Sequence, residues 1–238
     1  MASDDGLRRN AILAALPDEE LSRLSDDMDV VESQVRTQVY EPGGPISDVY
    51  FPLASVFSVV GMADDRVAVE VATTGREGMV GLPVFLGAAT TPHAAFCQIP
   101  GAAAKTTAAH LRRVLTHDGA LHAALNRFTQ ATMVQIAQNV VCNSTHHLAE
   151  RAARWLLTTR DRIDRDEFAL TQEFLSQMLG VRRQAASGTA RQLQAEGLIS
   201  YRRATITITD TPGLEHVACS CYQIVKAEFD LITGQGIR

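Results

Sequence analysis

The pattern of apolar and polar residues changes twice along the chain. Between about residues 35 and 110, short β-branched and aromatic runs such as Val49-Tyr50-Phe51 and Val56-Phe57-Ser58-Val59-Val60 alternate with Gly and Pro. Many short strands with regular turn signals predict a β-barrel or β-roll. The preceding residues 11–30 predict a short helical lead-in, because Pro17 is followed by acidic residues that suit the first turn of a helix.

From about residue 120, apolar residues recur at steps of three and four, and neither Gly nor Pro interrupts residues 120–159. This predicts a long amphipathic helix over about 120–143, then a second helix over 146–160. A helix of the first length spans roughly 35 Å. We expect it to pack against a copy of itself, although packing on its own β-domain is an alternative that does not exclude the first. The expected dimer seam is Leu121, Leu125, Phe128, Thr132, Ile136 and Val140.

The C-terminal third follows the pattern strand, helix, helix, hairpin, helix. Thr171 is a good N-cap for a helix over 172–179, and Gly180 supplies the positive φ of a tight turn. A second helix begins near Arg182 and ends at Gly197. Two such helices share one core and leave the outer face of the second for a DNA major groove. The residues predicted to form that core are Phe174, Leu175, Met178, Leu179, Ala186, Ala190 and Leu193.

The outer face of the second helix carries groups that read DNA. Arg183 and Gln184 lie in its N-terminal part, from which base contacts usually come. Arg can bond bidentately to guanine, and Gln to adenine. Other positions suit phosphate, at the first helix's N-terminus and at a hairpin tip in the following segment 200–209. The predicted DNA contacts are Thr171, Gln172, Arg182, Arg183, Gln184, Ser187, Arg191, Arg202 and Arg203.

The net charge supports DNA binding only when it is counted separately for each region of the chain. The net charge of −5 alone argues against DNA binding, but residues 171–209 carry +3, which leaves −8 elsewhere. A basic patch on an acidic body attracts DNA locally, and a chance cluster of solvated arginines is the alternative. Four scattered cysteines favour a reducing cytoplasm over a disulfide framework. No apolar run reaches the roughly 18 residues of a membrane span, so no membrane partner is expected.

Three segments resemble the Crp/Fnr family of bacterial regulators, and the resemblance covers residues 35–215. They are Gly180-Val-Arg-Arg-Gln with Gly197-Leu-Ile-Ser-Tyr, Glu150-Arg-Ala-Ala-Arg-Trp-Leu-Leu and Gly75-Arg-Glu-Gly-Met-Val-Gly-Leu-Pro. The resemblance implies an α+β fold with a β-roll (double-stranded β-helix, jelly-roll-like) of the cyclic-nucleotide-binding kind, a long dimerisation helix and a C-terminal winged helix-turn-helix. The expected domains are 1–118, 119–146 and 147–238. The resemblance also implies a homodimer on palindromic double-stranded DNA, with RNA polymerase as a partner.

The residues that bind cyclic AMP in this family are missing at the matching positions. Leu82 follows Gly81 where relatives have Glu, and His93-Ala94 replaces Arg-Ser. Ile136 falls where a polar residue touches the base. Without a cation, the phosphate loses a charge-assisted bond, so cyclic AMP is not the expected effector. We predict no cofactor and leave an unknown small-molecule effector open, with its pocket near Gly81, Leu82, His93, Ala94 and Ile136.

The sequence gives only weak signals for iron–sulfur or metal sites. No Cys precedes Cys97, which argues against the N-terminal iron–sulfur centre of oxygen-sensing relatives. Cys219-Ser-Cys221 near His216 suggests a metal, but residues i and i+2 of a helix point apart. We therefore expect no metal site. Gly188 stands where many relatives have a second recognition Arg, so their operator sequence is not assumed.

An enzyme is the least favoured class, because no Ser/His/Asp triad, phosphate loop or dinucleotide signature occurs. Two alternatives remain beside a DNA-binding regulator with a different effector or none. One is a regulator that binds a cyclic nucleotide in an altered pocket. The other is a sensor module that acts through a protein partner and does not read DNA.

Overall fold

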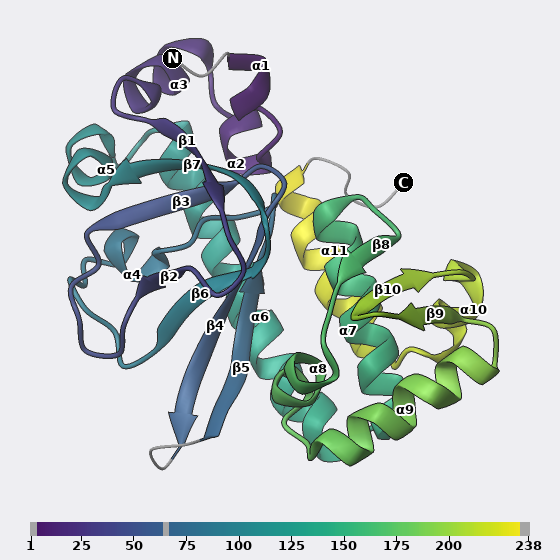
Figure 1. The fold of residues 1–238 in the computed structure, drawn as a ribbon. Coiled ribbons are helices and arrows are strands. Elements are labelled where there is room, and N and C mark those ends of the chain that lie inside the picture. The colour runs from purple at the N-terminus through teal and green to yellow at the C-terminus, as the bar shows by residue number, and fades with distance from the viewer. Residues whose placement is uncertain (1–3, 64–66, 234–238) are drawn as a thin grey trace.

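The N-terminal half of the chain folds as a β-roll (Figure 1) in the computed structural model, which describes residues 4–63 and 67–233. One antiparallel sheet has the order β1 (Asp29–Ser33), β7 (Gly101–Thr107), β3 (Asp48–Pro52). The other has the order β2 (Gln38–Tyr40), β6 (Ala94–Ile99), β4 (Val56–Ala63), β5 (Val67–Thr74). The predicted β-roll is confirmed, and it begins slightly earlier than expected.

Short helices close the ends of the roll. The predicted helical lead-in consists of α2 (Ala11–Ala14) and α3 (Asp18–Ser25), preceded by α1 (Asp4–Leu7). The acidic residues after Pro17 do form the first turn of α3. The remaining helices of this half are α4 (Leu82–Phe85) and α5 (Ala108–Val114).

The predicted long helix is α6 (Ala120–Thr145), and it packs against the roll. Phe128 lies in the same core as Phe51 and Phe57 of the sheets. Gly78 makes this packing possible, because a Cβ at that position would overlap the Phe128 ring. The break between the two helices comes slightly later than expected, at His146 and His147, whose extended backbone separates α6 from α7 (Leu148–Ile163). Glu150 and His147 then form a capping box for α7.

The predicted winged helix-turn-helix is present. It comprises β8 (Glu167–Ala169), α8 (Gln172–Leu179), α9 (Arg183–Ala195), β9 (Ile199–Arg202), β10 (Thr205–Ile208) and α10 (Thr211–Val217). Its sheet has the order β8-β10-β9. Gly180 has φ 64° and ends α8 as expected. All seven predicted core residues are buried, with exposed fractions of 7% or less.

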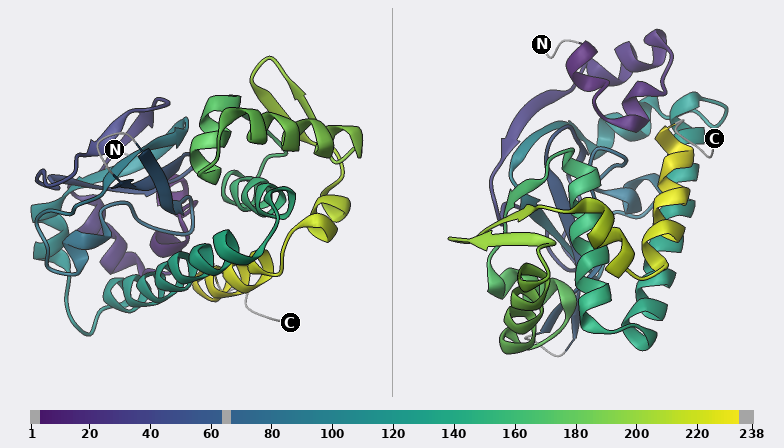
Figure 2. Two further views of the ribbon diagram at one scale, coloured as in Figure 1. Left: turned by 90° about the horizontal axis from the view of Figure 1, so that it is seen from below. Right: turned by 90° about the vertical axis from the view of Figure 1, so that its right-hand side faces the viewer.

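The last helix, α11 (Cys221–Thr233), returns to the N-terminal half and lies along α6 (Figure 2). Val225, Phe229 and Ile232 join the core of the β-roll and α6. The expected third domain, residues 147–238, included α11. In the structure, α11 packs mainly on the core of the β-roll and α6. Among residues 4–63 and 67–233, no helix has the length and apolar character of a membrane span.

Candidate nucleic-acid interface

The turn between α8 and α9 sets the position of the candidate interface. The Thr171 hydroxyl accepts a hydrogen bond from the Phe174 backbone nitrogen at 3.1 Å, as predicted for the N-cap of α8. After Gly180, Arg182 is extended and α9 begins at Arg183. Because the apolar faces of both helices are buried in a shared core, the opposite face of α9 lies at the outside of the molecule (Figure 2).

Two predicted contact residues are bonded to each other across the two helices. The Ser187 hydroxyl on α9 donates to the side-chain oxygen of Gln172 on α8 at 2.7 Å. The NH₂ group of Gln172 remains available as a hydrogen-bond donor, and a phosphate oxygen is a hydrogen-bond acceptor. This bond links the first turn of α8 to the middle of α9.

A shallow hollow gathers residues from α8, α9 and the wing. Four predicted contacts line it, namely Thr171, Gln172, Arg183 and Arg203, together with Glu173, Tyr201 and Ala204. The hollow therefore brings the two elements predicted to bind phosphate next to the start of α9. The predicted contacts Arg182, Gln184, Arg191 and Arg202 are exposed but do not line this hollow.

Tyr201 was not among the predicted site residues. Its hydroxyl donates to the Leu170 carbonyl at 3.0 Å, and its backbone nitrogen donates to the Gln194 side chain at 2.7 Å. Burial raises the pKa of Tyr201, and the Arg183 charge opposes that shift. Tyr201 therefore ties the hairpin to α9 and to the segment that precedes α8. Its only signal in the sequence was its place in Gly197-Leu-Ile-Ser-Tyr.

The tip of the wing holds two residues in the left-handed region. Arg203 has φ 48° and Ala204 has φ 61°, the sign pattern of a two-residue type I′ hairpin turn. This conformation costs non-glycine residues roughly 1–2 kcal/mol each. The turn projects Arg203 beside the recognition helix despite that strain.

The five arginines of the interface are not neutralised by neighbouring carboxylates. Within the described part of the chain, no ion pair involves Arg182, Arg183, Arg191, Arg202 or Arg203. Their positive charge is thus available to a polyanion, which favours the phosphate role over arginines committed to surface ion pairs.

The other side of the helix-turn-helix is docked on the β-roll. Phe174 of α8 meets Phe96 of β6 edge to face, with ring centroids 6.1 Å apart. Glu70 of β5 lies between Ser58 and Trp155 of α7, each of which donates to its carboxylate at 2.9 Å. Burial raises the pKa of Glu70 to about 7, although both hydrogen bonds oppose the shift. The candidate interface therefore faces away from the β-roll.

The residues predicted for the effector pocket lie in different surroundings. Gly81 and Leu82 begin α4, where a Cβ on Gly81 would press against Val49. His93 bonds to Thr91 at 3.3 Å and precedes Ala94 at the start of β6. Ile136 is 40% exposed on α6.

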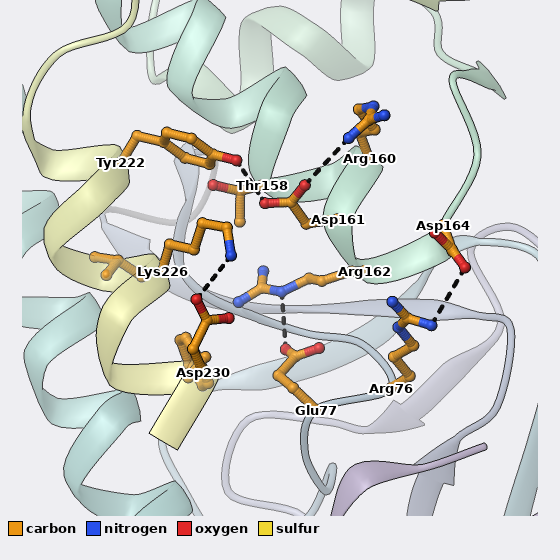
Figure 3. Close-up of a pocket in the computed structure, with 12 residues that line it drawn as sticks. Arg76, Glu77, Thr158, Arg160, Asp161, Arg162, Asp164, Tyr222, Lys226 and Asp230 are labelled. Atoms are coloured by element: carbon orange, nitrogen blue, oxygen red, sulfur yellow. Dashed lines mark hydrogen bonds and ion pairs between the residues drawn. The ribbon is translucent and has the colours of Figure 1, made fainter. Parts of the chain in front are cut away.

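A cavity of about 190 Å³ lies instead between α7, α11 and the loop that begins at Gly75 (Figure 3). Arg162 donates to Glu77 at 2.8 Å, and both side chains are more than nine-tenths buried. Acidic and basic side chains line the cavity. The Tyr222 hydroxyl donates to Asp161 and the Lys226 ammonium donates to Asp230, each at 2.7 Å. This network could not be predicted from the sequence, because its members are spread over residues 76–230.

The terminal nitrogens of Arg162 point to an incomplete network in this cavity. Neither has a hydrogen-bond partner within the described residues, although the guanidinium lies 5.4 Å from the centre of the Phe229 ring. A buried cationic group with unused donors is a place where an anionic ligand atom or an ordered water can bind.

Half of the predicted dimer seam is wrong. Leu121, Leu125 and Phe128 are at most 4% exposed and belong to the chain's own core, so they are not available to a second copy. Thr132 is half-buried. Hydrophobic periodicity shows that a helix has an apolar face but does not show which partner covers it. Exposed apolar residues occur further along α6, namely Met133, Ile136, Val140 and Val141, with exposed fractions of 40–64%.

The reason given against a metal site does not hold. Cys219 lies before α11, and Cys221 is its first residue, so the spacing within a helix does not apply. These two cysteines meet Cys142 and His146, and one ligand atom of each residue lies within 4.8 Å of the others. His216, which the sequence suggested as a partner, is not in this group.

Comparisons with known proteins agree with this fold. Residues 150–217 match the family described as the Crp-like helix-turn-helix domain. FixK2 from Bradyrhizobium japonicum superposes with a TM-score of 0.69 at 16% identity, over 81% of this chain and 98% of its own. A CRP-family transcriptional regulator from Thermus thermophilus gives 0.65 at 20% identity, over 79% and 96%.

A third solved structure is described as the c-di-GMP responsive global regulator CLP of Xanthomonas campestris. It superposes with a TM-score of 0.62 at 17% identity, over 82% of this chain and all of its own. No curated protein matches the chain. At these identities, the solved structures establish the fold, and the match over residues 150–217 identifies the helix-turn-helix domain.

Proposed function

We propose that this chain, which has the fold of the Crp/Fnr transcription regulators and carries their helix-turn-helix domain, regulates transcription as a homodimer on a palindromic operator. The observation that carries the proposal is the hollow in which Thr171, Gln172, Arg183 and Arg203 converge from three elements. Beside the one carboxylate of Glu173, the lining of this concave surface offers donors and two arginines, which match the phosphate backbone beside a major groove.

The interface divides into base-reading and phosphate-binding groups. Arg183 and Gln184 occupy the first turn of α9, which enters the groove and reads base edges. Arg203, Arg202 and the N-terminus of α8 contact phosphates on either side of that groove. Two further arginines contact the phosphate backbone of the DNA. They are Arg191, two turns further along α9, and Arg182, just before its first turn.

The second copy packs on the exposed apolar stripe of α6, defined by Met133, Ile136, Val140 and Val141. A stripe at helical spacing on a long helix favours a helix-to-helix dimer. Such a dimer presents two recognition helices to half-sites about one helical turn apart, roughly 34 Å. RNA polymerase is the partner through which the bound dimer acts, and the protein is a regulator rather than an enzyme.

The effector, if the protein has one, is not cyclic AMP in the family's usual pose, because Leu82 and His93 replace the ligands of its ribose and phosphate. The cavity beside Arg162 is the better candidate pocket, since it joins the β-roll loop to α7 and α11 (Figure 3). A small ligand with one anionic group fits the unused donors of Arg162. Micromolar binding of cyclic AMP or cyclic GMP in calorimetry would restore the cyclic-nucleotide alternative.

Selection from random duplexes followed by fluorescence anisotropy tests DNA reading. We expect Arg183→Ala to weaken operator binding by about 1–3 kcal/mol and to relax preference at one base pair. Arg203→Ala should weaken all sequences alike and reduce the salt slope by about one. Arg112→Ala, an exposed arginine on α5, is the control. If Arg183→Ala and Gln184→Ala change neither affinity nor preference, the assignment is wrong. Failure to select any sequence would favour the sensor alternative.

Light scattering tests the dimer. We expect Met133→Glu and Val140→Glu to yield monomers, because each places a charge in an apolar seam. Leu86→Glu is the matched control, since Leu86 is 61% exposed outside that stripe. A dimer that survives both seam variants contradicts the proposed interface.

A further inference from the structure

We propose that Cys142, His146, Cys219 and Cys221 form a tetrahedral Zn²⁺ site. The four residues come from two places in the sequence. Cys142 lies in the last turn of α6, and His146 is the C-cap of the same helix, so their side chains lie on one face at i and i+4. Cys219 and Cys221 flank the turn into α11.

The distances suit one small cation. The sulfurs of Cys142 and Cys219 are 3.4 Å apart, and the Cys221 sulfur is 3.4 Å from His146 Nδ1. With Zn–S bonds of about 2.3 Å and Zn–N bonds of about 2.0 Å, a tetrahedron places ligand atoms roughly 3.5–3.8 Å apart. All four ligand atoms lie within 4.8 Å of one another, so small side-chain movements are enough to close the site.

The donor set and burial select the metal. Three thiolates and one imidazole suit Zn²⁺ and do not suit Mg²⁺ or Ca²⁺, which take oxygen ligands. Cys142 and Cys221 are fully buried, and Cys219 is 6% exposed. His146 is half-buried. Four protein ligands leave no position for substrate, which is the arrangement of a structural site.

Nearby groups complement the charge of a zinc-bound site. Zn²⁺ with three thiolates carries one negative charge, and Arg151 and Arg154 of α7 lie close enough to interact electrostatically with Cys142. The Nε atoms of both arginines are buried without hydrogen-bond partners in the described residues. Gln138 donates to the Cys221 sulfur at 3.1 Å, which is the outer hydrogen bond that metal-bound ligands commonly receive.

A disulfide between Cys142 and Cys219 is the competing chemistry. A disulfide involves only two of the four groups and does not account for the position of Cys221 and His146 beside them. Zinc uses all four and ties the end of α6 to the segment that leaves the winged domain.

The first experiment measures metal in tag-free full-length protein purified under reducing conditions from zinc-supplemented cells. We expect about one zinc per chain by mass spectrometry. After chelation, Co²⁺ should restore the visible absorption of a tetrahedral thiolate complex, and chelation should lower the melting temperature. These readouts use the unmodified chain and do not depend on whether a variant folds or on DNA binding.

Variants then locate the site. Cys142→Ser and Cys221→Ser should each lose the zinc, whereas Cys97→Ser, which changes a buried cysteine of the β-roll outside the cluster, should retain it. Three outcomes overturn the proposal. They are protein that takes up neither Zn²⁺ nor Co²⁺, zinc retained at full stoichiometry by both cluster variants, and a Cys142–Cys219 disulfide in protein kept reduced throughout.

Discussion

The indole nitrogen of Trp155 donates a hydrogen bond to the Glu70 carboxylate at 2.9 Å, and this bond joins α7 to the outer strand of the β-roll. Ser58, on the neighbouring strand, donates to the other carboxylate oxygen. A carboxyl group thus lies at the contact between the two halves of the molecule, where desolvation opposes its charge.

Glu70 should make stability depend on pH near neutrality. Burial raises its pKa from 4.5 to about 7 in the folded chain, so between these values the folded state holds a proton that the unfolded state has lost. The free energy of unfolding contributed by this group therefore falls as the pH rises through that window, by up to about 3 kcal/mol. Glu70→Gln should remove this slope.

Urea denaturation across that pH window compares wild type with Glu70→Gln, and exposed Glu41→Gln serves as the control. Wild type should lose stability relative to Glu70→Gln as the pH rises. Parallel curves for the two proteins would show that Glu70 does not titrate in this window.

Glu77→Gln should destabilise the protein severely. The substitution leaves the buried Arg162 guanidinium without its charge partner, a change that costs about 3–5 kcal/mol. Arg76→Gln is the matched control, because it removes a neighbouring exposed ion pair with Asp164, and such pairs contribute at most about 1 kcal/mol. Equal, small losses in chemical denaturation would contradict a structural role for the buried pair.

Gly188→Ala separates stability from DNA binding. A Cβ at this position meets no atom within 4 Å, so alanine should stabilise α9 by up to about 1 kcal/mol. We expect operator affinity to fall at the same time, because in the proposed complex the new methyl group would project towards the DNA. Thermal melts and anisotropy on the same samples measure both effects. Unchanged affinity would mean that this glycine has no role in DNA approach.

Gly78→Ala should have the opposite effect on stability. Its Cβ would overlap the Phe128 ring in the core, and overpacking of this kind costs about 1–3 kcal/mol. A Gly78→Ala variant as stable as wild type would show that the loop or the ring moves aside easily.

Local patterns predicted the helix-turn-helix well. Its helices are short, its cap is Thr171 and its turn depends on one glycine, so all the determining signals lie within a few residues of each other. The same periodicity misled for Leu121, Leu125 and Phe128, because an apolar stripe looks alike whether it faces the chain's own sheet or a second protein. Only the three-dimensional arrangement of the β-roll and α11 shows that their side of α6 is covered.

Long-range pairs could not be predicted from spacing. Cys142 and Cys219 are 77 positions apart, and nothing local indicates that α11 turns back along α6. The expectation of no metal site depended on placing Cys219 and Cys221 on one helix, whereas the helix begins only at Cys221. Glu77 and Arg162 likewise meet only through the docking of the two halves.

The return of α11 to the β-roll also constrains how the winged domain can move. The chain enters that domain through His146 and His147 and leaves it through residues 218–220, and the ligand atoms beside these two connections lie within 4.8 Å of each other. A domain that is joined to the rest of the molecule by two adjacent backbone connections has a single pivot. The domain can swing about that point, but it cannot translate away from it. Twisting the domain would wind the two connecting segments around each other. Any repositioning of α9 relative to the long helix is therefore a lever motion, in which a small change of angle at the pivot becomes a larger displacement at the recognition surface.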